Sequence, residues 1–550
     1  MKRTALPLAL CALLILAACG RDEAPRPAAR QAASATATPL NPVRGGRLIE
    51  ATIGEPSNLI PPLATDASSH EVADLIYVSP LKYDKDINLV PYAAESYEVL
   101  EGGRLLRFTL RKDIRWTDGE PLTARDVEFT YKLMVDPNTP TAYAEDYLAV
   151  KEFRRTGEYT FEARYDKPFA RALVTWAHAI LPRHLLQGQD LLKTPLARKP
   201  VGAGPYMLKE WTGGNRLVLV PNPDYFEGRA YIDEVVMRII PDQSTQFMEL
   251  KSGNLDIINL SPQQYLLQTE DQDWARNYRK FQYVTSGYTF LGYNLKSPLF
   301  SDVRVRQAML HAIDKDEIVR GVLLGLGQAA NGPYKPGTWA FNEGIPDNEF
   351  DPARARRLLA EAGWKRRSVD GPLVDAKGRA FAFTILTNQG NSQRIKAAII
   401  IQSRLKDLGI KVEIRTVEWA AFLKEFIDKG RFDAVILSWN ILQDPDLYDV
   451  WHSSKAEPGG LNFVGFKNPE LDDLLERGRR MLDQTARKPL YDRIQNILHE
   501  EQPYCFLYVP MALPMVHARV MGIEPAPAGI THNFIRWWIP KSHQGPELIQ

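Results

Sequence analysis

The residues best placed to bind a ligand follow an apolar run, 432–439, that is typical of a buried strand. A strand that ends at a surface can offer its N–H and C=O groups to an extended peptide, which gives affinity independent of side chains. Aromatic rings beside it can wall the pockets for the peptide's side chains. The candidates in this loop are Trp439, Asn440, Asp444, Asp446, Tyr448 and Trp451. Trp439 either contacts the ligand or belongs to the core.

The chain lacks the short motifs of common catalytic and cofactor sites. It contains no Gly-x-x-x-x-Gly-Lys phosphate loop, no Gly-x-Ser-x-Gly elbow, no His-Glu-x-x-His and no Cys-x-x-Cys. The nine histidines have no metal-ligand spacing, and His499 with the two following glutamates is interpreted as the charged end of a helix. We therefore expect no enzyme activity, no cofactor and no bound metal.

The composition indicates a large body without an internal disulfide. The chain has 68 Lys and Arg against 67 Asp and Glu, so its charge does not predict nucleic-acid binding. At about 150 residues per domain, its length predicts three or so domains or lobes. Of the three cysteines, Cys11 and Cys19 lie in the N-terminal segment. The third, Cys505, lies in an apolar stretch and is expected to be a buried, inert thiol.

The N-terminus has the pattern of an export signal. A Lys-Arg pair precedes the apolar run 5–16, which is too short to span a bilayer of about 30 Å. The sequence Leu-Ala-Ala-Cys19 resembles a bacterial lipoprotein lipobox, which implies cleavage before Cys19 and lipidation of its thiol. Residues 1–18 are then the signal peptide, and 19–42, rich in Ala, Pro, Arg, Thr and Ser, are a flexible linker. The alternative is an ordinary secretory signal that contains Cys19.

Strand patterns alternate with helical patterns along the rest of the chain, which predicts an α/β fold. Thr123 is expected to cap a helix over 124–134, with Asp126 near its positive end. Pro352 is expected to start a helix that ends at Gly363. Other helices are expected over 303–313, 315–324 and 393–408, and strands over 105–110, 215–221, 234–240, 411–417 and 432–439.

Four sequence blocks, taken in order, carry a resemblance to a known family. They are Phe108–Val127; Pro200–Tyr206 with Glu210, Trp211 and Asn222–Tyr225; Gly292–Leu295 with Asp302–Ala308 and Ala312–Lys315; and Glu418–Trp419 with Phe432–Asp433, Ser438–Trp439 and Asp444–Asp446. Together they resemble the peptide-binding branch of ABC-importer solute-binding proteins, family 5, the dipeptide- and oligopeptide-binding type. The resemblance runs from about Gly46 to Arg536.

This resemblance implies a two-lobed α/β fold of the periplasmic-binding-protein class, with an extra inserted subdomain and a hinge between the lobes. The expected ranges are 43–78, 199–288 and 504–550 for lobe I, 79–198 for the inserted subdomain and 289–503 for lobe II. The two segments that cross between the lobes are expected near 286–293 and 502–509.

The resemblance also implies ligand contacts that this sequence matches only in part. Dipeptide and oligopeptide receptors place an Asp three positions after the residue corresponding to Trp439, where it pairs with the ligand's α-amino group; here that position holds Leu442. Asp444 either supplies the charge from a shifted position or caps the following turn. The dipeptide receptors also have an Arg before the helix 393–408, and this chain has none there. Arg394, on the helix itself, is interpreted as a surface or inter-element residue.

Further candidates come from the loop before that helix, from the blocks and from the N-terminal part of the body. They are Asn388, Gln389, Asn391, Trp419, Tyr293, Asn294, Glu55 and Asn58. Glu55 and Asn58 are expected in a rigid, proline-rich turn of the opposite lobe, where a helix cap at Asp66 or Ser68 is the alternative. The amide side chains suit a longer peptide held by its backbone, or an uncharged ligand such as an oligosaccharide.

The resemblance therefore implies a receptor on the extracytoplasmic, periplasmic side of a bacterial membrane. We expect it to capture a peptide, in the first place an oligopeptide, by lobe closure and to deliver it to the transmembrane subunits of an ABC permease. We expect a monomer, tethered to the membrane through Cys19 and without a nucleic-acid partner. The alternatives are the same fold binding an oligosaccharide or another small solute, and a sensory role. An exported hydrolase lacks a nucleophile–base pair.

Overall fold

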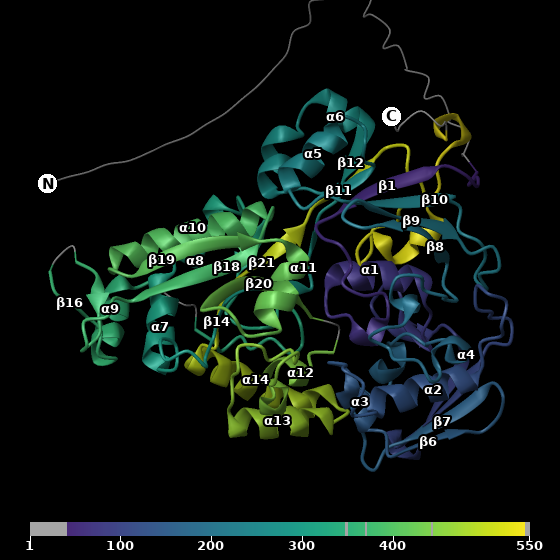
Figure 1. Ribbon diagram of the computed structural model, residues 1–550, viewed down its shortest axis with the longest axis horizontal. Helices are drawn as coiled ribbons and strands as arrows, with labels where there is room; N and C mark the ends of the chain where they lie inside the picture. The colour runs from purple at the N-terminus through teal and green to yellow at the C-terminus, as the bar shows by residue number, and fades with distance from the viewer. Residues whose placement is uncertain (1–40, 347–349, 369–370, 442–443, 545–550) are drawn as a thin grey trace, which may run out of the picture. The chain divides into compact units, whose positions relative to one another are not determined.

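The computed structural model describes residues 41–346, 350–368, 371–441 and 444–544 (Figure 1). The expected signal 1–18, the lipobox Cys19, the linker as far as residue 40, and Leu442 lie outside the described residues. Pro42–Gln550 fall in one compact unit. Within the described part of the chain, no helix is both long and apolar enough to cross a membrane.

The first lobe is built on a seven-stranded sheet. Its elements are β1 (Arg47–Thr52), β8 (Tyr206–Thr212), β9 (Arg216–Pro221), β10 (Glu234–Ile239), β11 (Ile257–Asn259), β12 (Tyr278–Lys280), β22 (Pro514–His517), α1 (Ala67–Ile76), α5 (Gln243–Lys251) and α6 (Gln272–Asn277). The strand order is β12-β22-β11-β1-β10-β9-β8. Because side chains alternate along β1, Leu48 and Ile49 enter different cores on the two faces of the sheet.

A small subdomain with a four-stranded antiparallel sheet packs on the first lobe. Its elements are β2 (Leu81–Tyr83), β3 (Leu89–Pro91), β4 (Ala94–Leu100), β5 (Leu105–Leu110), β6 (Glu152–Arg155), β7 (Thr160–Arg164), α2 (Ala124–Val135), α3 (Ala144–Leu148) and α4 (Arg183–Leu186), and the sheet order is β4-β5-β7-β6. Thr123 caps the start of α2, as predicted, and the side chain of Asp126 completes a capping box there. Phe108 and Trp176 share one core with Leu48 of the first lobe, so the two parts are joined by continuous packing.

The second lobe is built on another seven-stranded sheet. Its strands are β13 (Tyr283–Val284), β14 (Gly287–Tyr293), β15 (Gly327–Ala329), β18 (Ala382–Asn388), β19 (Lys411–Val417), β20 (Ala434–Asn440) and β21 (Tyr504–Ala512), and β16 (Lys365–Arg366) pairs with β17 (Leu373–Val374) outside it. The order is β13-β21-β14-β20-β18-β19, with β15 on β21.

Helices cover both faces of this second sheet. They are α7 (Val303–Ala312), α8 (Lys315–Gly321), α9 (Pro352–Glu361), α10 (Ser392–Asp407), α11 (Trp419–Ala421), α12 (Tyr448–Trp451), α13 (Pro469–Arg479) and α14 (Gln484–Glu501). Ile436 packs in a core with α7 to α10, and Leu437 packs in a core with α11 to α14. Figure 1 shows α10 and α14 on opposite sides of the sheet. The strand is therefore buried on both faces, as its apolar run predicts.

The chain crosses between the lobes twice, between β12 and β13 and between β21 and β22. The first crossing lies just before the expected segment 286–293, because β14 already pairs with β20 in the second sheet. The second corrects the expected boundary at residue 504. The run Tyr504–Ala512 pairs with β14 and β15, and the first sheet resumes at Pro514. The apolar residues of β21 thus complete the second lobe's two cores.

Most predicted elements are present, with small shifts at their ends. The strands Leu105–Leu110 and Lys411–Val417 have the expected bounds. The helix that starts at Pro352 ends at Glu361, followed by Gly363 with φ +91°. The helix expected over 315–324 ends at Gly321. Cys505 is buried on β21, and burial raises the pKa of its thiol, so the prediction of a buried thiol is confirmed.

Candidate functional site

One end of the second sheet lies beside the crossing segments and carries the predicted loop. Trp439 faces Tyr288 across β20 and β14. Trp439 is half-buried, and its Nε1 donates a hydrogen bond of 3.3 Å to Tyr504 Oη. Asn440 is exposed at the end of the strand. The N–H of Ile441 donates to the carbonyl of Ser286, which lies between β13 and β14, a few residues after the first crossing. This end of β20 is therefore next to the boundary between the lobes.

The two lobes touch directly at this boundary. A Cβ at Gly54 of the first lobe would lie 2.4 Å from Cδ1 of Trp419 in the second lobe. The backbone N–H and the hydroxyl of Ser392 both donate to Oε1 of Gln243, at 3.0 and 2.9 Å. The N–H of Gln243 in turn donates to the carbonyl of Gly390. The start of α10 is thus hydrogen-bonded to the start of α5.

A group of polar side chains, which we call the polar corner, lies at this same start of α10. It consists of Arg394, Asn388, Asn391, Ser438 and Thr289. Nη1 of Arg394 donates to Asn388 Oδ1 at 2.8 Å, and Nη2 donates to Ser438 Oγ at 2.9 Å. The hydroxyls of Ser438 and Thr289 are 2.8 Å apart, and Asn391 caps the helix. The corner therefore ties the ends of β14, β18 and β20 to α10.

The charge of Arg394 is held in a largely enclosed place. Its side chain stays partly accessible to water, although protein surrounds it on most sides, and this burial lowers the pKa of the guanidinium to about 10. At that pKa the group is still charged at neutral pH. No carboxylate of the described residues lies within ion-pair distance of it.

A second set of contacts joins the small subdomain to the second lobe through ion pairs. Asp146 and Arg171 of the subdomain pair at 2.7 Å, and Asp446 and Arg479 of the second lobe also pair at 2.7 Å. Across the boundary, Arg479 lies 3.2 Å from Asp146, and Arg171 lies 3.3 Å from Asp446. The N–H of Ala170 also donates to the carbonyl of Arg479 at 2.7 Å. We call Asp146, Arg171, Asp446 and Arg479 the four-charge cluster.

The four-charge cluster is buried and internally matched. The exposed fraction of each of its side chains is 8% or less. Burial opposes ionisation of Asp146, but the guanidiniums of Arg171 and Arg479 prevail and lower its pKa. Asp449 next to the cluster is different. Burial, reinforced by Asp146 and Asp446, raises its pKa to about 7, and among the described residues its Oδ1 has no hydrogen-bond partner.

The first lobe adds carboxylates on one face of α1. Glu71 and Asp74 are accessible to water but surrounded by protein on most sides. Burial, with the charges of Asp74 and Asp66 behind it, raises the pKa of Glu71 to about 7. Asp66 also caps α1 by accepting from the N–H of Ser69 at 2.9 Å, which is the structural alternative predicted for it.

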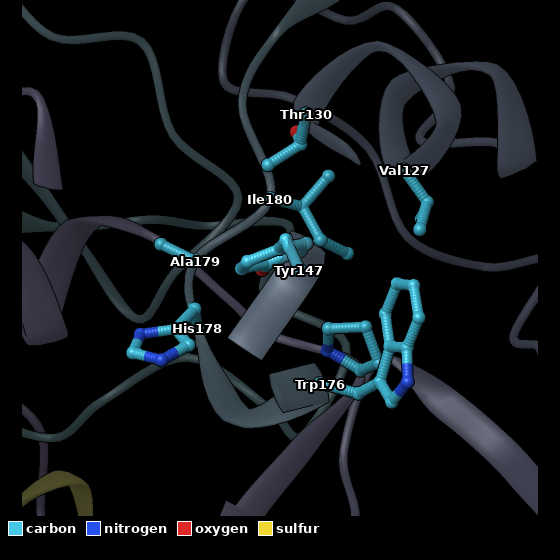
Figure 2. Close-up of a pocket in the computed structure, with 8 residues that line it drawn as sticks. Val127, Thr130, Tyr147, Trp176, His178, Ala179 and Ile180 are labelled. Atoms are coloured by element: carbon cyan, nitrogen blue, oxygen red, sulfur yellow. The ribbon is translucent and has the colours of Figure 1, made fainter. Parts of the chain in front are cut away.

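A small cavity lies inside the small subdomain, between α2, α3 and the segment after η3 (Val174–Ala177). Figure 2 shows Trp176, Tyr147 and His178 around it, with Val127 and Thr130 of α2. Its volume of about 10 Å³ has room for at most one water molecule. Burial lowers the pKa of His178 to about 4, so the ring is neutral at pH 7. This cavity belongs to the packing of the subdomain.

Comparison with known proteins places this geometry in a family. Residues 88–459 match the model of the bacterial extracellular solute-binding proteins, family 5. The chain is 34% identical to the oligopeptide-binding protein AppA of Bacillus subtilis, over 98% of this chain and 99% of that protein. The chain belongs to family 5. The structure of AppA in complex with a nonapeptide superposes on this family 5 protein with a TM-score of 0.86 at 33% identity, covering 91% of this chain and 100% of the other.

More distant members share the same architecture. The dipeptide-binding protein of Escherichia coli is 25% identical over 89% of this chain and 94% of its own length. The protein DppA of Helicobacter pylori, solved in complex with the peptide STSA, has a TM-score of 0.80 at 26% identity over 91% of this chain and 99% of the other. The fold of this family 5 protein is therefore two-lobed α/β, as expected, and it is an extracytoplasmic solute-binding protein.

In this family 5 protein, Asp444 and Asp446 are both occupied by protein groups. Asp444 receives two hydrogen bonds from Arg487, at 3.0 and 3.2 Å, and its Oδ1 also accepts from the N–H of Asp446. Of the two alternatives for Asp444, the structure shows the turn cap, together with an ion pair. Asp446 belongs to the four-charge cluster. Tyr448 lies under Arg479, whose Cζ is 4.1 Å from the ring centroid.

Three of the predicted ligand-binding residues are packed inside the second lobe or lie at the far end of its sheet. Tyr293 pairs with Ala434, at the opposite end of β14 and β20 from Trp439. Tyr293 is fully buried against Phe300, and Asn294 donates to the backbone of the loop before β20. Trp451 is also fully buried, 4.4 Å from the ring of Tyr504. Packing takes up the side chains of these three residues, and the ligand contacts expected of them stay predictions.

Other candidates lie at the lobe boundary but have structural partners. Glu55 accepts from Trp211 Nε1, from Arg198 and from the N–H of Gly214, at 2.8 to 3.1 Å. Asn58 accepts from the N–H of Ile60 within its own turn. Both side chains thus have partners within the protein, and the ligand contacts expected of them stay predictions. Trp419 remains at the boundary against Gly54, and Gln389 is exposed next to the polar corner.

Two groups of polar side chains at the lobe boundary were not predicted from the sequence. Arg394 was interpreted as a surface or inter-element residue; the structure shows the latter, inside the polar corner. Its local signal was the cap at Asn391, which puts Arg394 in the first turn of α10, over the loop that precedes it. The four-charge cluster had no local signal, because Asp146 and Arg479 are 333 residues apart. Within the described residues, no group of three or more His, Cys, Asp or Glu could hold a metal ion.

Proposed function

We propose that this family 5 protein is the receptor of an ABC importer and that it captures an oligopeptide by closing its two lobes on it. The observation that carries this proposal is the likeness, along the whole body, to a relative whose structure was solved with a nonapeptide. The receptor binds and releases its ligand without making or breaking a bond.

The contacts between the lobes support closure as the mechanism. Gln243 with Ser392 at one place and Arg479 with Asp146 at another join parts that are linked covalently only by two crossing segments. Such contacts can break and re-form when the lobes rotate about a hinge. A ligand that touches both lobes stabilises the closed form by its differential affinity for that form.

The arrangement of carboxylates supports a peptide that is held mainly along its backbone. Because Asp444 is neutralised by Arg487, it offers no unpaired charge to a ligand's amine. The end of β20 and the exposed amides of Asn440 and Gln389 remain as polar groups of the second lobe. Strand-like pairing with a peptide backbone gives affinity over many sequences.

We also propose that the thiol of Cys19 is lipidated and keeps the receptor close to its permease, since tethering raises the local concentration of one partner for the other. The support is the lipobox pattern in the sequence. Cells fed with labelled palmitate are expected to label the wild-type protein and not Cys19→Ser. Labelling of the variant would contradict the anchor at this residue.

The ligand class is tested by native mass spectrometry of the protein purified from its own cells without refolding. We expect a co-purified mass, or a distribution of masses, that tandem spectra identify as peptides of several residues. Added peptide at 100 times its dissociation constant should also stabilise the protein by about 2.7 kcal/mol. A sugar or metal complex as the retained ligand, with no thermal shift from any peptide mixture, would overturn the proposal.

A further inference from the structure

The end of the second lobe that points away from the first lobe carries an excess of positive charge. It consists of α9, the paired strands β16 and β17, and the turn that follows them (Figure 1). Residues 350–381 contain eight Lys and Arg and four Asp and Glu, in a chain whose totals are 68 and 67. The rest of the chain therefore has more acids than bases, and the positive excess is concentrated at this one place.

The cations of this end face water, and the acids beside them are engaged elsewhere. Asp375 pairs with Arg379 at 2.7 Å, and Asp351 accepts from two backbone N–H groups at the start of α9. Glu361 is exposed. Six Lys and Arg are exposed and have no carboxylate of the described residues within ion-pair distance. We call these six the basic end; they are Arg354, Arg356, Arg357, Lys365, Arg367 and Lys377.

The local structure holds the basic end on a firm support. Ala355 and Leu359 bury one side of α9 in the core that it shares with α7. Because a helix has about 3.6 residues per turn, the three arginines of α9 lie outside this buried side. Strand β16 begins three residues after α9, and Lys365 pairs with Val374 of β17. The N–H of Leu373 donates to the carbonyl of Gly409 after α10, so the strand pair is fixed to the body of the lobe.

A group of exposed cations on a firm support suits an extended anionic surface. The lipobox pattern and the linker 19–42 provide such a surface nearby, because a linker of about two dozen residues has a reach on the order of 25 Å. Anionic headgroups attract Lys and Arg, and the attraction falls off within a Debye length of about 8–10 Å. A lipid anchor combined with a basic patch also binds a membrane more firmly than either does alone.

We propose that the basic end docks on the anionic phospholipid surface of the membrane to which the receptor is tethered. This inference rests on the part of the proposed function that concerns the lipid anchor, and it does not depend on the identity of the peptide. The linker enters the body at β1 in the first lobe, and Figure 1 shows β1 and α9 toward opposite ends of the long axis. Two attachments so far apart lay the long axis along the membrane, which keeps both lobes near the transmembrane subunits.

The experiment is sedimentation of the purified chain with lipid vesicles. The parent protein is the chain from residue 19 with Cys19→Ser, because a lipid anchor would itself bind the vesicles. The vesicles contain phosphatidylcholine alone or with about 30% phosphatidylglycerol, at low and high salt. The test variant combines Arg354→Gln, Arg356→Gln and Arg357→Gln. The matched control combines Lys199→Gln, Lys251→Gln and Arg276→Gln, which remove three exposed and unpaired cations of the first lobe.

We expect the parent to bind the vesicles that contain phosphatidylglycerol, to bind those of phosphatidylcholine alone far more weakly, and to bind less as the salt concentration rises. Each Lys or Arg near an anionic surface contributes about fivefold in affinity, so the α9 variant should bind at least about tenfold more weakly. The control variant should stay within about twofold of the parent, because its cations lie away from the docking face. Unchanged melting temperature and peptide affinity show that the α9 variant is folded.

A second variant tests the same face through another element. Lys365→Gln, Arg367→Gln and Lys377→Gln together should weaken vesicle binding by a similar factor, which keeps the test decisive if the α9 variant does not fold.

Three results would overturn the inference. Equal losses in the α9 variant and the control would mean that only net charge matters. No binding of the parent to anionic vesicles would leave this face to a protein partner. Binding abolished by inorganic phosphate at constant ionic strength would indicate a site for a free anion. Because the vesicle test uses neither peptide nor lipid anchor, it can fail while peptide capture and labelling of Cys19 succeed, and either of those can fail while it succeeds.

Discussion

The polar corner and the four-charge cluster both lie where parts of the two lobes meet, and both contain arginines. In the four-charge cluster, each guanidinium has a carboxylate from its own side of the boundary and another from the opposite side. In the polar corner, Arg394 has two neutral oxygens, both from its own lobe. One boundary contact is therefore complete without a ligand, and the other has an uncompensated charge.

The difference shows how a binding protein can close without becoming permanently shut. When the lobes separate, Asp146 keeps Arg171, and Asp446 keeps Arg479, so neither side is left with a lone buried charge. The contact between two neutral pairs is weaker than that between two single charges, which makes it reversible.

The largest expected effect comes from breaking the matched cluster. Asp146→Ala leaves Arg171 and Arg479 to share Asp446, with Asp444, which is paired with Arg487, at 3.9 Å from Arg171. We expect a loss of about 3–5 kcal/mol in the free energy of unfolding, because a buried charge is uncompensated. Urea denaturation measures this loss.

The matched control for this variant is Asp166→Ala, which removes an exposed carboxylate that pairs with Lys151 at 3.4 Å. That change should cost less than about 1 kcal/mol. Equal effects of the two substitutions would mean that the cluster contributes no more than a surface pair.

A second expected effect is a pH dependence due to Asp449. Its pKa is raised to about 7 by burial and by the neighbouring acids, whereas an Asp in the unfolded chain titrates near 3.9. The folded protein holds this proton more tightly, so the stability it contributes is present below about pH 4 and is lost between about pH 4 and pH 7. Asp449→Asn keeps the shape and removes the titration.

The unfolding free energy of Asp449→Asn should therefore exceed that of the wild type by a margin that grows from about pH 4 to pH 7 and then stays constant. Three pKa units correspond to a margin of at most about 4 kcal/mol. Denaturation series at several pH values measure it. If the unfolding free energies of the two proteins differ by the same amount at every pH in this range, the pKa of Asp449 is not raised in the folded protein.

A smaller effect is expected from Gly54→Ala, at the place where Gly54 of the first lobe meets Trp419 of the second lobe. The added Cβ would meet the ring of Trp419 at 2.4 Å, so the closed form must shift to accommodate it. We expect peptide affinity to fall about tenfold, about 1.4 kcal/mol, through destabilised closure. Titration calorimetry measures this. Gly332→Ala, where the nearest atom would be 3.7 Å away, is the control, and equal affinities for the two variants would contradict the role of this contact.

The smallest expected effect concerns recognition of the ligand's amine by Asp444. Because Arg487 neutralises this carboxylate, Asp444→Asn should weaken the binding of a free peptide and of its N-acetylated form by the same factor. Paired titrations with the two peptides measure this ratio. A larger loss for the free peptide than for the acetylated one would show that Asp444 pairs with the ligand's amine. It would contradict the view that Arg487 neutralises this carboxylate.

Local signals along the chain were sufficient for most of the elements. Thr123 predicted the start of α2, and the apolar run at 432–439 predicted a buried strand, which the structure shows to be covered on both faces. The boundary at residue 504 was wrong because an apolar strand has the same pattern whichever core it enters. Tyr293, Asn294 and Trp451 have residue types that suit a binding site. Only the register of β14 and the depth of packing distinguish a side chain that lines a binding site from one that belongs to the core.

The sequence alone predicts an exported chain with the lipobox pattern, an α/β body and membership of family 5, because such features are encoded in short segments and in their order. The tertiary structure was needed to assign partners to charges. Asp146 meets Arg479 across 333 residues, and Asp444 meets Arg487 on another helix, so their neutralisation follows from the packing of distant elements. For the same reason only the fold shows that Arg394, unremarkable on its helix, is an enclosed cation beside the lobe boundary without a carboxylate among the described residues.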